Sequence, residues 1–180
     1  MNNITNNSPI ADLLKQTGIG LNIQTSINEA KKGCTANLKL LKEAGCPMDS
    51  RTCSGAARNG HLETLKWLRS VGCPWDDQTC SVAARNGQLE TLKWMRANGC
   101  PWGMSACAFA ALEGHLDTLK WLRAEGCPWN SYEVEFAAEG GHLEILQWLE
   151  HSGCFWSEEV IRDMATRLRR KRVLTWLADR

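Results

Sequence analysis

A frame of 27 residues is repeated along this chain. Its most regular mark is a series of cysteines at a constant interval: Cys46, Cys73, Cys100, Cys127 and Cys154. The residues between them recur as well, so that CPMDSRTCSGAARNGHLETLKWLRSVG at 46–72 is followed by CPWDDQTCSVAARNGQLETLKWMRANG at 73–99. A fixed period in this range indicates a solenoid, in which each unit buries its apolar face only against its neighbours.

Each unit is predicted to hold two short helices. In the unit at 73–99, the first helix covers the small, Ala-rich segment 79–85, and the second covers 89–97. Gly87 and Gly99 follow these segments, and glycine just past a helix end accepts the left-handed conformation that closes the last turn. The second helix of the preceding unit has an apolar stripe wide enough to pack between two neighbours, made by Leu65, Trp67, Leu68 and Val71.

The segment AARNGHLETLKWL at 56–68 resembles the second half of the ankyrin repeat, and Gly72-Cys73 stands where that family has Gly-Ala. The family repeat has about 33 residues, and the residues missing here fall between Trp75 and Thr79. This gap implies a stubby loop in place of the projecting β-hairpin. The resemblance covers about 27–153 well and the tail loosely. It implies an all-α, ankyrin-like α-solenoid of stacked helix-turn-helix repeats with reduced β-hairpin loops.

Four such repeats are expected at 46–153, between degenerate capping repeats at 19–45 and 154–180. Residues 1–18 are predicted to be disordered or to form a short helix, because their first part is Asn-rich with almost no apolar content. In the last segment Leu168-Arg169 replaces the Gly-His step of the repeat, and the pattern of its second helix allows a slip of one residue.

The composition argues against several classes of protein. A net charge of +1 provides no overall attraction to nucleic acid or to an anionic membrane. We find no apolar run long enough to span a membrane and no secretory leader. Nine cysteines would suggest disulfides in a secreted chain, but the missing leader favours a reducing compartment. We therefore expect an intracellular, cytoplasmic monomer, with a nuclear location as the open alternative.

The repeating cysteines and histidines are interpreted as structural. Cys73 and Cys80 have six residues between them, whereas zinc knuckles use two to four, and Val134 takes the Cys80 position in the fourth unit. Stacked equivalents about 8–10 Å apart would also exceed the reach of a disulfide. Gln88 fills the position that His61, His115 and His142 occupy in the other repeats. An amide cannot replace a general base, but it could keep a hydrogen bond to a turn, so a structural role is favoured for the histidines. We expect no cofactor, no metal and no enzymatic activity.

Two further patterns leave alternatives open. Tryptophans on the second helices (Trp67, Trp94, Trp121 and Trp148) are predicted to be core residues, whereas those in the connectors either staple two layers or line a binding face: Trp75, Trp102, Trp129 and Trp156. The run RLRRKR at 167–172 is a solvated helix face, a nuclear-import signal or a nucleic-acid patch, and the first interpretation is favoured.

Specificity is expected at positions that differ between repeats, because the recurring positions build the stack. These variable positions cluster after the Pro-Trp step and before the glycine between the helices. The predicted function is a non-catalytic protein-protein interaction scaffold, with a nuclear or nucleic-acid adaptor using 167–172 as the alternative; neither a small-molecule substrate nor a membrane is expected as a partner. The candidate partner-binding residues are Arg51, Arg58, Trp75, Asp76, Asp77, Gln78, Arg85, Trp102, Met104, Trp129, Asn130, Tyr132 and Glu139.

Overall fold

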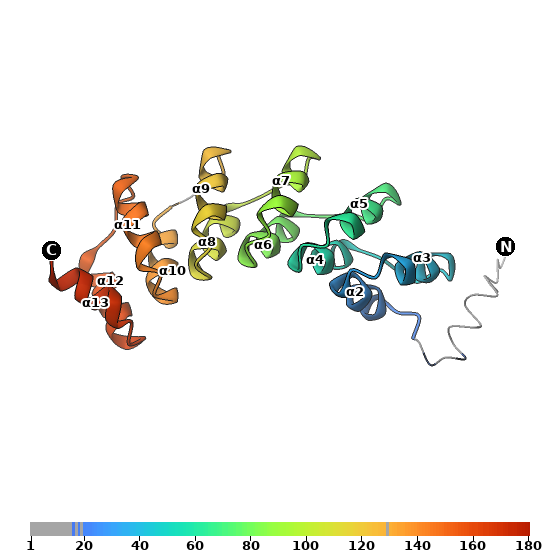
Figure 1. Cartoon of the computed structure of the whole chain (residues 1–180), viewed down its shortest axis with the longest axis horizontal. Helices are drawn as coiled ribbons and strands as arrows, with labels where there is room; N and C mark the ends of the chain where they lie inside the picture. The colour runs from blue at the N-terminus through green and yellow to red at the C-terminus, as the bar shows by residue number, and fades with distance from the viewer. Residues whose placement is uncertain (1–15, 17, 19, 129) are drawn as a thin grey trace, which may run out of the picture.

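The computed structural model describes residues 16, 18, 20–128 and 130–180, and this part of the chain contains helices but no strand. The helices form consecutive pairs in one elongated stack (Figure 1). The pairs are α2 (Ile23–Lys32) with α3 (Thr35–Glu43), α4 (Ser50–Arg58) with α5 (Leu62–Ser70), α6 (Asp77–Arg85) with α7 (Leu89–Ala97), α8 (Met104–Leu112) with α9 (Leu116–Ala124), α10 (Tyr132–Gly140) with α11 (Leu143–His151), and α12 (Glu158–Arg167) with α13 (Lys171–Ala178). The predicted all-α solenoid is confirmed. The prediction for residues 1–18 lies almost wholly outside the described residues.

The first helix of a repeat starts earlier than its Ala-rich segment suggests, because an aspartate caps it. In α6 the side chain of Asp76 accepts a hydrogen bond from the backbone N–H of Thr79 at 3.0 Å, and the backbone N–H of Asp76 is 3.2 Å from Thr79 Oγ1. Asp49 and Thr52 form the same capping box at α4. Such reciprocal bonds satisfy N–H groups that have no partner inside the helix, and they place the start of α6 at Asp77 instead of Thr79.

The stack has an inner row and an outer row of helices. Figure 1 shows α4, α6, α8 and α10 on the inner side of a shallow arch, whereas α5, α7, α9 and α11 fan outward. The inner helices bury small side chains, such as Ala83 and Ala84 on α6, and small residues let helices approach closely. The outer helices bury larger residues, such as Leu92 and Met95 on α7. The difference in side-chain size therefore bends the stack toward the first helices.

The cysteines at the 27-residue interval tie each repeat to the preceding one. Cys73 Sγ lies 3.3 Å from the carbonyl oxygen of Asp49, and Cys100 Sγ lies 3.5 Å from that of Asp76. Both acceptors are N-cap residues of the preceding first helix. All nine cysteines are free thiols, and seven are buried. A buried cysteine is a small hydrophobe with a weak donor, and this pairing uses both properties.

A second series of contacts crosses the turn between the two helices. His115 Nε2 lies 3.1 Å from the carbonyl oxygen of Arg85, in the preceding repeat, and His142 Nε2 lies 2.9 Å from that of Leu112. Since a carbonyl only accepts, each Nε2 carries the proton. The ring of His115 lies so close to Gly87, which has a φ of 66°, that a Cβ there would be 2.7 Å from Nδ1. The side-chain amide of Gln88 forms no hydrogen bond with any described residue, so it occupies the histidine position without making the bond that the histidines make.

The last pair corrects the expected alignment of the tail. Arg169 has a positive φ of 56°, as the glycine of the Gly-His step has in the other repeats, and Arg170 takes the place of the histidine. Arg170 donates from Nε to the carbonyl oxygen of Glu139 at 2.7 Å. The Gly-His step is thus replaced by Arg169-Arg170 and not by Leu168-Arg169. The reason is that α12 has 10 residues whereas the first helices α4, α6, α8 and α10 have 9, which moves the turn by one position.

Candidate partner-binding surface

The first helices share a surface that is built from residues spaced i, i+4 and i+7. These positions lie within about 60° of one another around a helix with 3.6 residues per turn. On α4 the middle position is Gly55, which is buried against α2. The other positions, which we call the first-helix face, are Arg51 and Arg58 on α4, Gln78, Val82 and Arg85 on α6, Ser105, Phe109 and Leu112 on α8, Tyr132, Phe136 and Glu139 on α10, and Glu159, Asp163 and Thr166 on α12.

Charge changes sign along the first-helix face. The only charged residues of its first part, on α4 and α6, are basic: Arg51, Arg58 and Arg85. Those of its last part, on α10 and α12, are all acidic: Glu139, Glu159 and Asp163. All six are exposed. The helices place the basic and the acidic group on one continuous surface.

The middle of the first-helix face is apolar. Phe109 and Phe136 are half-buried, and their ring centroids are 6.4 Å apart. The guanidinium of Arg85 lies 5.3 Å from the centroid of Phe109, at the border with the basic part. Tyr132 is 58% exposed at the start of α10. An aromatic pair that is half-covered in the free chain still has surface to bury against a partner.

A depression of about 510 Å³ lies beside the basic part. Arg58, Arg85, Asn86, Glu113 and His115 line it. Glu113 pairs with Arg85 through Oε1 and Nε at 3.0 Å. The side chain of Arg58 forms no hydrogen bond or ion pair with any residue in the described part of the chain, and its guanidinium is therefore a free cation beside the depression.

Several candidate residues from the sequence have local structural partners. Asp76 caps α6, and Asn130 accepts a hydrogen bond from the backbone N–H of Tyr132 at 2.9 Å through Oδ1. Asp77 and Gln78 are exposed in the first turn of α6, and Met104 is 51% exposed in that of α8. Trp129 lies outside the described residues. The structure thus brings Arg51, Arg58, Gln78, Arg85, Tyr132 and Glu139 together on the first-helix face, whereas the other described candidates lie beside it, in and near the connectors.

The connector tryptophans pack between two repeats. Trp75 meets Trp94 edge to face with centroids 5.8 Å apart, and the guanidinium of Arg69 lies 4.1 Å from its ring. Trp102, Trp121 and Arg96 repeat this arrangement at 5.7 Å and 4.1 Å. Both connector rings are half-buried. Because each arginine belongs to the preceding repeat, these contacts are those of a staple between layers.

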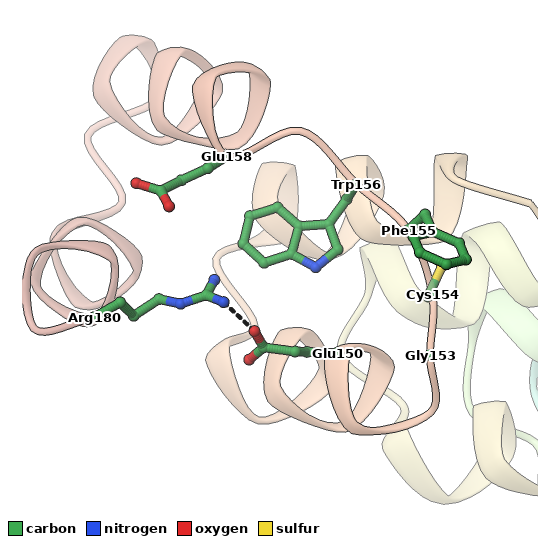
Figure 2. A pocket seen from close by; sticks show the side chains of 7 residues that line it. All are labelled: Glu150, Gly153, Cys154, Phe155, Trp156, Glu158 and Arg180. Atoms are coloured by element: carbon green, nitrogen blue, oxygen red, sulfur yellow. Dashed lines mark hydrogen bonds and ion pairs between the residues drawn. The ribbon is translucent and has the colours of Figure 1, made fainter.

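At the C-terminal end of the stack, a different arginine packs against the connector tryptophan. Glu150 stands where Arg69 and Arg96 stand in earlier repeats, and Figure 2 shows Arg180 reaching back to pair with it beside the Trp156 ring. The Arg180 guanidinium lies 4.9 Å from the centroids of both Trp156 and Trp176. Glu150, Trp156 and Arg180 line a shallow pocket of about 380 Å³, in which Glu150 and Arg180 neutralise each other.

The basic run at 167–172 is partly used to attach the last pair. Arg170 bonds to the backbone of α10, and Arg172 pairs with Glu144 of α11 at 2.8 Å. Arg167, Arg169 and Lys171 are exposed. Two of its five cations therefore have partners in the chain, which favours a structural role over a nucleic-acid patch.

Sequence reasoning missed the apolar centre of this surface, although a signal was present. Val82, Phe109 and Phe136 each lie four residues after a variable position, namely Gln78, Ser105 and Tyr132. Counting along the helix from those positions would have placed both phenylalanines on the same face as Arg85 and Glu139.

These features define the chain as an α-solenoid repeat protein with a variable inner face. A family model described as ankyrin repeats (3 copies) matches residues 53–133. This central part of the chain therefore resembles ankyrin repeats, here with a 27-residue period. A search of curated proteins found no match. Within the described part of the chain, no helix is long and apolar enough to span a membrane, and no three His, Cys, Asp or Glu side chains gather as they would around a metal ion.

Proposed function

We propose that this chain is a non-catalytic scaffold that binds another protein through the first-helix face. Ankyrin repeats generally mediate protein-protein interaction. The proposal rests on a difference between two kinds of position in the repeat. Recurring residues pack one repeat against the next, whereas the residues of the first-helix face differ from repeat to repeat. An exposed surface of variable residues on a regular frame is suited to recognising one particular partner.

The polar residues that would suggest chemistry are engaged in the framework. His61, His115 and His142 donate to backbone carbonyls of the preceding repeat. The capping aspartates hold helix starts, and Cys73 and Cys100 donate to N-cap carbonyls. These structural roles of the described histidines, aspartates and cysteines support a binding role. The intracellular, cytoplasmic location expected from the sequence stays a prediction.

The test is a capture experiment from the native host, comparing the wild-type chain with two matched variants. Arg85→Glu with Tyr132→Ala changes the first-helix face, and Lys93→Glu changes the outer helix α7. Each variant is first checked for unchanged helical circular dichroism. We expect the face variant to lose specific partners that wild type and Lys93→Glu both retain. Equal capture by all three chains would show that the face is wrongly assigned.

A further inference from the structure

We propose that the partner presents an extended peptide segment whose side chains run from acidic, through large and apolar, to basic along the stack from α4 to α12. This inference rests on the proposed function, because it takes the first-helix face as the binding surface. It adds the chemistry of the partner and the order of its side chains.

The acidic residue of the partner is assigned to the depression beside Arg58 and Arg85. Arg58 has no partner among the described residues, and Arg85 shares its guanidinium between Glu113 and the Phe109 ring. Two cations and one anion leave a net positive charge there. Arg51 contributes less, since Asp49 already pairs with it at 2.7 Å. A carboxylate placed between Arg58 and Arg85 would form charge-assisted hydrogen bonds in the geometry that guanidinium groups favour.

The large apolar residue is assigned to the aromatic pair on α8 and α10. Phe109 and Phe136 face a neighbourhood that also includes half-buried Leu112 and exposed Tyr132. A leucine or phenylalanine of the partner would complete the burial of both rings. Such central aromatic contacts usually dominate the energy of an interface.

The basic residue is assigned to the acidic end. Glu139, Glu159 and Asp163 are exposed, and none forms an ion pair with another residue in the described part of the chain. The only charged side chains that a lysine or arginine would meet on this face above α10 and α12 are acidic. The two charged ends also give the complex a direction, because a partner placed in the opposite orientation would meet like charge at both ends.

The spacing of the helices fixes the spacing of these residues in the peptide. Neighbouring packed helices are about 8–10 Å apart, and an extended chain rises about 3.3 Å per residue. Each helix therefore corresponds to about three residues. The apolar residue should lie about five or six residues from the acidic one, and the basic residue about three residues beyond it.

The experiment uses synthetic twelve-residue peptides in a Ser-Gly host, labelled with fluorescein and followed by anisotropy. The matching peptide has Glu at positions 2 and 3, Phe at 8 and Arg at 11, and a second peptide has this sequence reversed to cover both chain directions. A charge-swapped peptide exchanges Glu and Arg. We expect one matching peptide to bind at least about tenfold more tightly than the charge-swapped one, which corresponds to about 1.4 kcal/mol.

Charge reversal on the protein gives the decisive comparison. Arg58→Glu with Arg85→Glu should invert the preference, so that the charge-swapped peptide binds more tightly than the matching one. Phe136→Ala should weaken both peptides, and Lys93→Glu should change neither. The proposal is overturned if neither chain direction binds, or if the double variant weakens both peptides equally. In that case, partners that are still lost from the face variant in the capture experiment would preserve the proposed function.

Discussion

Arg170 donates from Nε to the carbonyl oxygen of Glu139 and so takes, in the last helix pair, the place that His142 holds beside Leu112 one repeat earlier. The last carbonyls of a helix have no partner within it. Each of these side chains satisfies one such carbonyl at the end of the preceding first helix. Histidine and arginine therefore donate to the same kind of backbone carbonyl, and this series of contacts extends to the last helix pair.

Replacing Arg170 should loosen the last helix pair. Arg170→Ala removes a hydrogen bond from a charged donor, for which net contributions are about 1.5–3 kcal/mol, and partial exposure of the side chain reduces this to about 1 kcal/mol. Urea unfolding followed by circular dichroism gives the measurement. Arg167→Ala is the control, because this exposed arginine has no partner among the described residues. A loss as large for Arg167→Ala would mean that net charge, and not the bond to Glu139, is responsible.

Two glycines with similar backbones should differ in how well they accept alanine. Gly87 and Gly99 both have a positive φ, of 66° and 80°, so alanine strains either by about 1 kcal/mol. A Cβ at Gly99 would meet nothing within 4 Å, whereas one at Gly87 would press into the ring of His115. We expect Gly87→Ala to cost about 2–3 kcal/mol, since it also breaks the bond from His115 to Arg85. Equal losses in urea unfolding would show that the close contact has no energetic importance.

The buried thiols should resist chemical modification. The hydrogen bond with Cys73, together with burial, raises the pKa of Cys53, and the same two causes act on Cys107 beside Cys127. A thiol held protonated and away from solvent is a poor nucleophile. With Ellman's reagent we expect reaction in the native protein only at the two half-buried cysteines, Cys34 and Cys154, and a slower one at Cys154, because burial raises its pKa as well. All nine should react in guanidinium, and fast reaction of the other seven in the native protein would contradict the packing described above.

Glu133 should make stability depend on pH. Its Oε2 accepts from the backbone N–H of Asn130 at 2.8 Å, but its Oε1 is buried with no hydrogen-bond partner. Burial raises the pKa of this carboxyl above its ordinary value of 4.5. The folded protein therefore holds the proton more tightly than the unfolded chain does, and the free energy of unfolding decreases as pH rises from about 4.5 through the raised pKa.

The variant Glu133→Gln tests this dependence. It should be more stable than wild type at pH 7.5, and the difference should close as the pH falls below about 4.5, where the Glu133 carboxyl becomes protonated in both the folded and the unfolded chain. Urea unfolding at several pH values provides the measurement, with Glu135→Gln on the same helix as the control. A pH-independent difference between Glu133→Gln and wild type would rule out the titration of this carboxyl as the cause.

Much of the fold could be predicted from the sequence, because recurring residues mark where the helices of each repeat begin and end. The second helix predicted at 89–97 matches α7, since a recurring leucine starts it and Asn98-Gly99 ends it. The start of α6 was missed because Asp76 was treated as a variable surface residue, although with Thr79 it forms a capping box. The tail was misaligned because Arg169 adopts a backbone conformation that sequence patterns reserve for glycine.

The candidate surface was harder to predict, because its residues depend on contacts between repeats. The variable arginines and glutamates were found, since they differ at aligned positions. The role of Trp75 was left open because it depends on Arg69, which comes from the preceding repeat. Phe109 and Phe136 were missed because each occupies a half-buried position whose equivalent on α4 is Gly55.

The histidine bonds all run in one direction, from each repeat back to the one before it, so the two ends of the stack are not equivalent. If the chain is cut after a repeat, the histidine and cysteine donors of the next repeat are lost. The backbone carbonyls that they contacted are then exposed, and water can donate to them. A break before a repeat leaves histidines pointing at a neighbour that is gone, together with the cysteines that reached the same way. Removing repeats from the C-terminal end should therefore destabilise the remaining stack less than removing them from the N-terminal end, and a shortened stack should be cut from the C-terminal end.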